Sequence, residues 1–124
     1  MEKTCSFTNL NMWKLAHELV LQTYKITSTY PKSELFCLTS QFRRAVVSIP
    51  ANIAEGYKRL SKNEKLRFFN VAQASLEECR YYIILSKDLL YINDEIFEIQ
   101  MDQLLKTSKS LNKYCEKLLS DIYT

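Results

Sequence analysis

The sequence is poor in glycine, proline and histidine. Its 124 residues include one glycine, two prolines and one histidine. Glycine and proline make most tight turns, so their scarcity argues against a protein of many short strands and favours long helices. No run of about 18 apolar residues occurs, so we expect no membrane span. The segment Met1–Phe7 is too polar for a secretory signal peptide. The length predicts a single domain, residues 1–124, and 47% hydrophobic residues suffice for a packed core.

The residues that could bind a metal or act as nucleophiles are few and far apart. The four cysteines are Cys5, Cys37, Cys79 and Cys115, and the lone histidine is His17. No Cys-x-x-Cys pair occurs, and a di-iron bundle needs two Glu-x-x-His motifs. A single glycine also leaves no glycine-rich loop for a phosphate. We therefore expect no catalytic residues, no cofactor and no metal, and reduced thiols in a cytoplasmic protein. We interpret His17 as structural, and Cys79 and Cys115 as small core residues.

Apolar residues recur with helical spacing in four stretches. The helices that these stretches predict cover residues 11–28, 39–56, 62–91 and 94–122. The apolar face of the first helix follows Trp13, His17, Val20 and Tyr24, and Leu10, Ala16 and Leu21 widen it. An all-α protein is therefore expected.

The second helix continues through a proline. Its apolar stripe is formed by Phe42, Val46, Ile49 and Ile53. Pro50 lies inside the stripe, where a proline costs about 3 kcal/mol. Since the stripe keeps its phase, we expect one helix, kinked at Pro50 and held by packing. Thr39 is the expected N-cap, and Gly56 is the expected left-handed C-terminal cap.

Polar residues surround this proline. Pro50 leaves the carbonyl of Val46 without its usual donor, and a buried carbonyl needs a partner. Ser48, Asn52 and Glu55 either build a local network there or face a partner subunit, and both interpretations stay open.

The third and fourth helices carry apolar residues every seven positions. Ser61 and Glu64 form a capping box at the start of the third helix. The large residues of the two seams are Phe69, Leu76, Ile83 and Leu90, then Phe97, Leu104, Leu111 and Leu118. Their mostly small companions are Ala72, Cys79 and Ser86, then Met101, Ser108, Cys115 and Ile122. The short connection 91–93 makes the two helices antiparallel. Their apolar faces are wider than one seam, which favours self-association.

The basic residues form two groups on a chain of net charge +3. The first group surrounds the connection between the second and third helices and consists of Lys58, Arg59, Lys62, Lys65 and Arg67, with Arg43 and Arg44 earlier on the second helix. It is either a phosphate-contacting patch or a solvated loop that complements a helix dipole. The second group is Lys106, Lys109, Lys113 and Lys117, which we interpret as a solvated face.

Several motifs together resemble the bacterial four helix bundle protein family, which is known from reading frames in intervening sequences of 23S ribosomal RNA genes. The matching residues are Trp13, 16–20, Tyr24, 38–41, 43–45, 48–56, Arg59, Phe69, Ala72, Ser75, Leu76 and Glu78. The run Ser-Ile-Pro-Ala-Asn-Ile-Ala-Glu-Gly at 48–56 is the most specific of them. Cys37 departs from the family, which commonly has glycine there.

The resemblance implies an antiparallel, up-down-up-down four-helix bundle that assembles as a homopentamer. It defines no catalytic residues. A distant relative, the accessory protein of diversity-generating retroelements, binds nucleic acid and a reverse transcriptase. We therefore expect a non-enzymatic homo-oligomer that binds RNA, a ribonucleoprotein or a nucleic-acid-processing protein through basic surface, and no membrane. The alternative is an interaction adaptor or scaffold without nucleic-acid affinity.

Overall fold

The chain folds into four long helices. The structure, a computed structural model, describes residues 6–121. The helices are α1 (Asn11–Thr27), α2 (Leu38–Lys58), α3 (Lys62–Asp88) and α4 (Asp94–Ser120). Two short 3-10 turns, η1 (Phe7–Asn9) and η2 (Lys32–Glu34), precede α1 and α2. The described residues include no strand, and the all-α prediction is confirmed. The predicted Ile122 lies outside the described residues.

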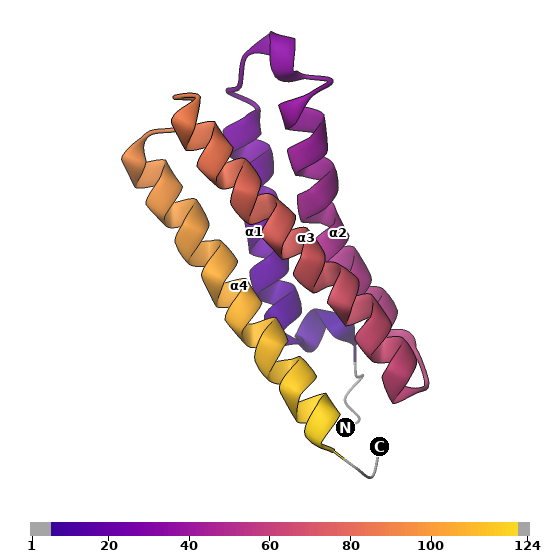
Figure 1. Cartoon of the computed structure of the whole chain (residues 1–124). Coiled ribbons are helices and arrows are strands. Elements are labelled where there is room, and N and C mark those ends of the chain that lie inside the picture. The colour runs from indigo at the N-terminus through magenta and orange to yellow at the C-terminus, as the bar shows by residue number, and fades with distance from the viewer. Residues whose placement is uncertain (1–5, 122–124) are drawn as a thin grey trace, which may run out of the picture.

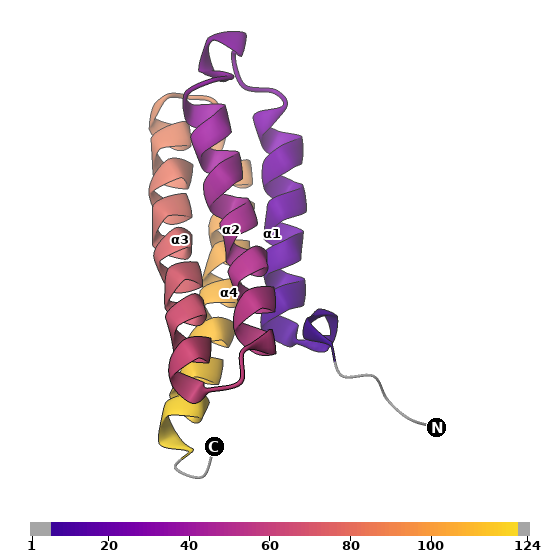
Figure 2. The ribbon, with the colours of Figure 1, turned by 90° about the vertical axis from the view of Figure 1, so that its right-hand side faces the viewer.

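The helices lie side by side as a bundle (Figure 1). Each packs against two others, in the cyclic order α1, α2, α3, α4 and back to α1. Successive helices run in opposite directions, and Figure 2 shows the same alternation from the side. The turn η2 and the α3–α4 connection lie at the upper end of Figure 1, and the α2–α3 loop lies at the lower end.

The core follows the predicted stripe of α2. The side chains of Phe42, Val46, Ile49 and Ile53 are all buried. The helix is continuous through Pro50, as predicted. Cys79 and Cys115 are also buried, as predicted, and burial raises the pKa of both thiols.

The predicted apolar face of α1 overlaps only in part with the face that the bundle buries: Ala16 is buried, and Trp13 and Val20 pack at the edge of the core. The buried residues of this helix are Met12, Ala16, Leu19, Thr23 and Thr27. His17 and Tyr24 are exposed, and Trp13 and Val20 are half-buried. The two faces are about 100° apart, which is the turn of one helical residue. The aromatic face is the more apolar in sequence, but the bundle packs the face with the smaller side chains.

Gly56 does not cap α2, which was the expectation. The helix runs on to Lys58, and no glycine of the described chain has a positive φ. Gly56 is buried, and a Cβ atom placed on it would lie 2.6 Å from Cε1 of Phe69. The glycine is therefore needed for the close approach of α2 and α3, not for a left-handed backbone.

The left-handed cap lies instead at the end of α3. Leu90 has φ 65°, and α3 ends at Asp88, before the predicted residue 91. The amide of Leu90 donates to the carbonyl of Lys87, and that of Tyr91 donates to Ser86. These two bonds form a Schellman motif on a non-glycine residue. Leu90 is 87% exposed, so it does not continue the predicted seam.

Glu34, not Thr39, satisfies the start of α2. The Leu38 amide donates to Oε1 of Glu34 at 3.2 Å, whereas Thr39 is buried inside the first turn. The Tyr91 hydroxyl donates to Oε2 of the same glutamate at 2.7 Å, which raises the pKa of Tyr91. One carboxylate thus joins η2, α2 and the α3–α4 connection at the upper end.

Candidate nucleic-acid interface

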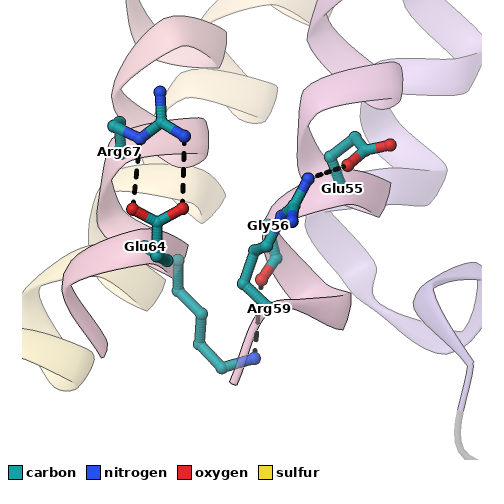
Figure 3. A network of polar contacts seen from close by, with 6 residues as sticks. Glu55, Gly56, Arg59, Glu64 and Arg67 are labelled. Atoms are coloured by element: carbon teal, nitrogen blue, oxygen red, sulfur yellow. Dashed lines mark hydrogen bonds and ion pairs between the residues drawn. The ribbon is translucent and has the colours of Figure 1, made fainter. Parts of the chain in front are cut away.

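The predicted basic residues between α2 and α3 lie around the loop at the lower end of Figure 1, and Figure 3 shows Arg59 and Arg67 beside the carboxylates of Glu55 and Glu64. We call this set the basic loop cluster; it consists of Lys58, Arg59, Lys62, Lys65 and Arg67. Ser61 caps α3 by accepting from the Glu64 amide at 3.1 Å, which confirms half of the capping box. The Glu64 carboxylate pairs with Arg67 at 3.1 Å instead of reaching back, and this hydrogen bond lowers the pKa of Glu64.

The two arginines of the basic loop cluster are already engaged. Arg59 pairs with Glu55 at 2.9 Å, so both guanidinium groups have a carboxylate partner. Both also lie over the ring of Phe68, with centroid distances of 4.6 Å for Arg59 and 4.9 Å for Arg67. An exposed ion pair is worth little energy, but it neutralises charge that a phosphate would otherwise meet.

Two lysines of the cluster donate hydrogen bonds to backbone carbonyls at helix ends. Nζ of Lys65 donates to the Tyr57 carbonyl at 2.7 Å and lies over the Tyr57 ring. It thereby satisfies the end of α2, and burial lowers its pKa. Nζ of Lys62 donates to the Asp121 carbonyl at 2.6 Å and so ties α3 to the end of α4. Within residues 6–121, Lys58 alone in the cluster has no hydrogen bond, ion pair or ring contact of its side chain.

Arg43 and Arg44 lie apart from the basic loop cluster. About 21 Å of helix axis separates Arg44 from Lys58. Nε of Arg43 donates to Thr27 Oγ1 at 2.8 Å, and its guanidinium covers the Tyr24 ring at 4.6 Å. Arg43 therefore binds the end of α1, while Arg44 is exposed.

The residues around Pro50 form a network that includes a residue which the sequence analysis did not assign to it. Nδ2 of Asn52 donates to the carbonyl and to Oγ of Ser48, at 2.7 and 2.9 Å. Ser75 of α3 donates to the same Oγ at 3.0 Å. The network therefore joins α2 to α3 within one chain, and Glu55 is not part of it. The signal in the sequence was that Ser75 is next to the core residue Leu76, which indicates a serine close to the buried side of α3.

The lysines of α4 are less engaged than the basic loop cluster. Lys106 pairs with Asp102 at 3.1 Å. Lys109, Lys113 and Lys117 are exposed and have no ion pair or side-chain hydrogen bond within the described chain. Beside them lies a shallow hollow of about 290 Å³ between α1 and α4. Its lining consists of Asn11, Leu15, Lys106, Lys109, Ser110 and Lys113. Asn11 and Ser110 are joined across it at 3.2 Å.

Residues 6–121 offer neither a metal site nor a membrane-spanning helix. No group of three or more His, Cys, Asp or Glu side chains is placed to hold a metal ion. None of the four helices combines the length and the apolar character that a membrane crossing requires.

Comparison with known proteins identifies a family and a fold. The model of the 23S rRNA-intervening sequence protein family matches residues 8–113. A solved structure from Bacteroides thetaiotaomicron, a protein of unknown function from the S23 ribosomal protein family, superposes with a TM-score of 0.79 at 21% identity. The match covers 85% of this chain and 95% of that one. No curated protein matches the sequence.

Proposed function

Because the chain belongs to the 23S rRNA-intervening sequence protein family, we propose that it is a non-enzymatic, self-associating helical protein that binds RNA through the lysines of α4. The number of copies, five, comes from the family resemblance alone. RNA is the chemistry that the family's genetic setting suggests, and the exposed lysines are the groups that can bind it.

One observation carries this proposal: three neighbouring ammonium groups on α4 form no ion pair with any carboxylate of the described chain. Lysines at positions 106, 109, 113 and 117 follow one side of the helix over about 16 Å. Free ammonium groups release counterions when they meet phosphates, which drives binding to a polyanion. The basic loop cluster is the weaker candidate, because four of its five cations already have partners inside the chain.

The test is an anisotropy titration of structured RNA at two salt concentrations. Lys109→Glu with Lys113→Glu should abolish most of the binding. Milder Lys→Ala changes at both positions should make the negative slope of log K against log salt shallower by about 1.4 to 1.8, at about 0.7 to 0.9 for each lost phosphate contact. The matched control is Lys25→Glu with Lys32→Glu, which makes the same change of net charge on exposed lysines elsewhere.

Each outcome decides between named surfaces. If the control pair weakens binding as much as the α4 pair, the effect is one of net charge and the α4 site is wrong. If the α4 pair binds like wild type while Lys58→Glu does not, the basic loop cluster is the site. Reversal of Lys62 or Lys65 is unsuitable, because both side chains hold backbone carbonyls.

The alternative function is a protein-interaction adaptor without nucleic-acid affinity. The observation that favours it is the exposed aromatic face of α1, where Tyr24 is 42% accessible. Wild-type protein that shows no affinity for RNA at low salt would leave this alternative in place.

A further inference from the structure

The outer surface between α1 and α2 is an apolar groove without an occupant in the monomer. We call it the α1–α2 groove. Its walls are Trp13, Val20 and Tyr24 of α1 and Val47, Ala51 and Ala54 of α2. A hollow of about 280 Å³ lies at its centre. This hollow shares Ala51 and Ala54 with one of about 690 Å³ at the lower end, and Val47 with one of about 520 Å³ at the upper end.

The aromatic wall of this groove is ordered by its own contacts. The Trp13 ring stacks on His17 at 4.9 Å with an interplanar angle of 10°. Phe7 meets the same indole edge-on at 5.4 Å. The opposite wall carries small side chains, Ala51 and Ala54, which let a further helix approach closely. Such a surface, with an ordered aromatic wall and a small-residue wall, suits a helix as occupant.

The charges at the two ends of the groove have one sign. Arg43 and Arg44 line its upper part, and Lys58 and Arg59 line its lower part. The single carboxylate among the described lining residues is Glu55, and it is paired with Arg59. The occupant should therefore be a helix with an apolar middle and exposed acids.

The outward face of α3 in the same chain has these properties. Helix α3 packs against α2 and α4, so its third side is open. On it Tyr81 is 57% exposed and Val71 is 43% exposed. The carboxylates Glu77, Glu78 and Asp88 are exposed near Tyr81 along the helix. Glu77 has a long ion pair of 3.9 Å with Arg80, and Glu78 accepts from the Tyr82 hydroxyl at 2.8 Å. Residues 77, 81 and 88 follow one side of the helix at spacings of four and seven, and Glu78 lies about 100° round the helix from Glu77.

We propose that the α1–α2 groove of one copy receives the outward face of α3 of a second copy, with Tyr81 as the aromatic anchor. The inference rests on the self-association proposed above and names the two surfaces that make it. The two surfaces lie on different sides of the bundle, so each copy has one donor face and one acceptor face. Such a head-to-tail contact either closes into a ring or extends as a filament.

Two variants each remove one half of the contact. Ala51→Arg fills the groove and adds a cation, and Tyr81→Arg removes the anchor and places a cation on the acidic face. Both positions are exposed, so the fold should survive, which circular dichroism and thermal melts check. Leu105→Arg is the matched control, since Leu105 is an apolar residue of α4 that is 48% exposed.

Light scattering of each variant and of their mixture gives the decisive result. Each of the two variants should be monomeric, while Leu105→Arg should keep the wild-type mass. An equimolar mixture should form a one-to-one dimer and nothing larger, because the intact groove of one variant can still accept the intact α3 face of the other.

Three other results would overturn the assignment. Wild-type mass for Ala51→Arg would place the contact elsewhere or leave the groove to a different protein. Two monomeric variants that do not pair would show that the groove and the α3 face are not the two halves of one contact. Monomeric wild-type protein would remove the self-association of the proposed function itself, which separates that failure from an error in the surfaces.

Discussion

At the residue scale, Gly56 and Leu90 each stand where backbone geometry alone would favour a different residue type. A helical backbone does not require glycine, and a left-handed backbone usually has one. Gly56 has ordinary helical geometry in a crowded place, whereas Leu90 has a left-handed backbone in an open place. Glycine is thus used here for space rather than for conformation. The two positions allow opposite predictions about stability from the same pair of physical terms, steric space and backbone strain.

We expect Gly56→Ala to destabilise the protein by about 1–3 kcal/mol. The new methyl group would meet Phe69, which is fully buried and cannot move freely. The gain in helix propensity is about 1 kcal/mol and does not offset the overlap. Urea unfolding measures the change, and Phe69→Leu in the same background should recover part of it. A neutral or stabilising Gly56→Ala would show that α2 and α3 separate at little cost.

Leu90→Gly should stabilise the protein by about 0.5–1 kcal/mol. A left-handed backbone costs a residue with a side chain about 1–2 kcal/mol. Glycine avoids this cost, but part of the gain is lost because its unfolded state is freer. Leu90 is 87% exposed, so little packing is lost. The control is Leu89→Gly, because Leu89 has right-handed geometry and its replacement should destabilise. Equal melting temperatures for both variants would contradict the argument.

At the scale of the element, α2 continues through Pro50 because its stripe is packed on both sides of the proline. The kink at Pro50 stays a prediction. Pro50→Ala should straighten the helix and change the free energy of unfolding by no more than about 1 kcal/mol, because the packing has already adapted to the proline. Since Pro50 also lines the α1–α2 groove, self-association should weaken.

Thermal melts and light scattering of Pro50→Ala test both parts. Ala54→Pro is the control, because a second proline in the same helix should cost about 3 kcal/mol or more. A straight wild-type helix in a crystal structure would remove the kink from the prediction, while the continuity of the helix would stand.

Helix α1 illustrates how far periodicity reaches. This helix has two apolar faces that are offset by one residue, and the apolar spacing alone favoured the aromatic face. The bundle buries the other, so Tyr24 lines an outer groove, and Trp13 lines the same groove while it packs partly buried against the edge of the core. An error of about 100° in the assigned face therefore marks a surface that the monomer does not cover.

At the scale of the whole molecule, we expect a stable homo-oligomer of five copies. Light scattering at micromolar concentration should give five times the mass of one chain. Because the proposed contact would cover the apolar groove only in the assembly, the melting temperature should rise with protein concentration. A stable tetramer or hexamer would contradict the number five and leave self-association standing, whereas a monodisperse monomer would contradict both.

At the candidate site, the sequence gives the positions of the cations, and the structure gives their partners. The positions of all the cations were available from the sequence, including the basic loop cluster and the α4 lysines. Their partners were only partly visible: Glu55 lies one helical turn from Arg59, but the Asp121 carbonyl that binds Lys62 is distant in sequence. These contacts favour the α4 lysines over the basic loop cluster as the phosphate-binding groups, a distinction that the positions of the cations alone do not make.

Four features follow from local patterns in the sequence: the four helices, the buried stripe of α2 through Pro50, the serine cap of α3 and the two core cysteines. These features depend on residues within a few turns of one another, so local spacing specifies them. Three other properties are set by packing between helices: which face of α1 is buried, why position 56 needs a glycine, and which cations have partners. Those properties depend on atoms from helices distant in sequence, and the packing of the bundle brings them within reach.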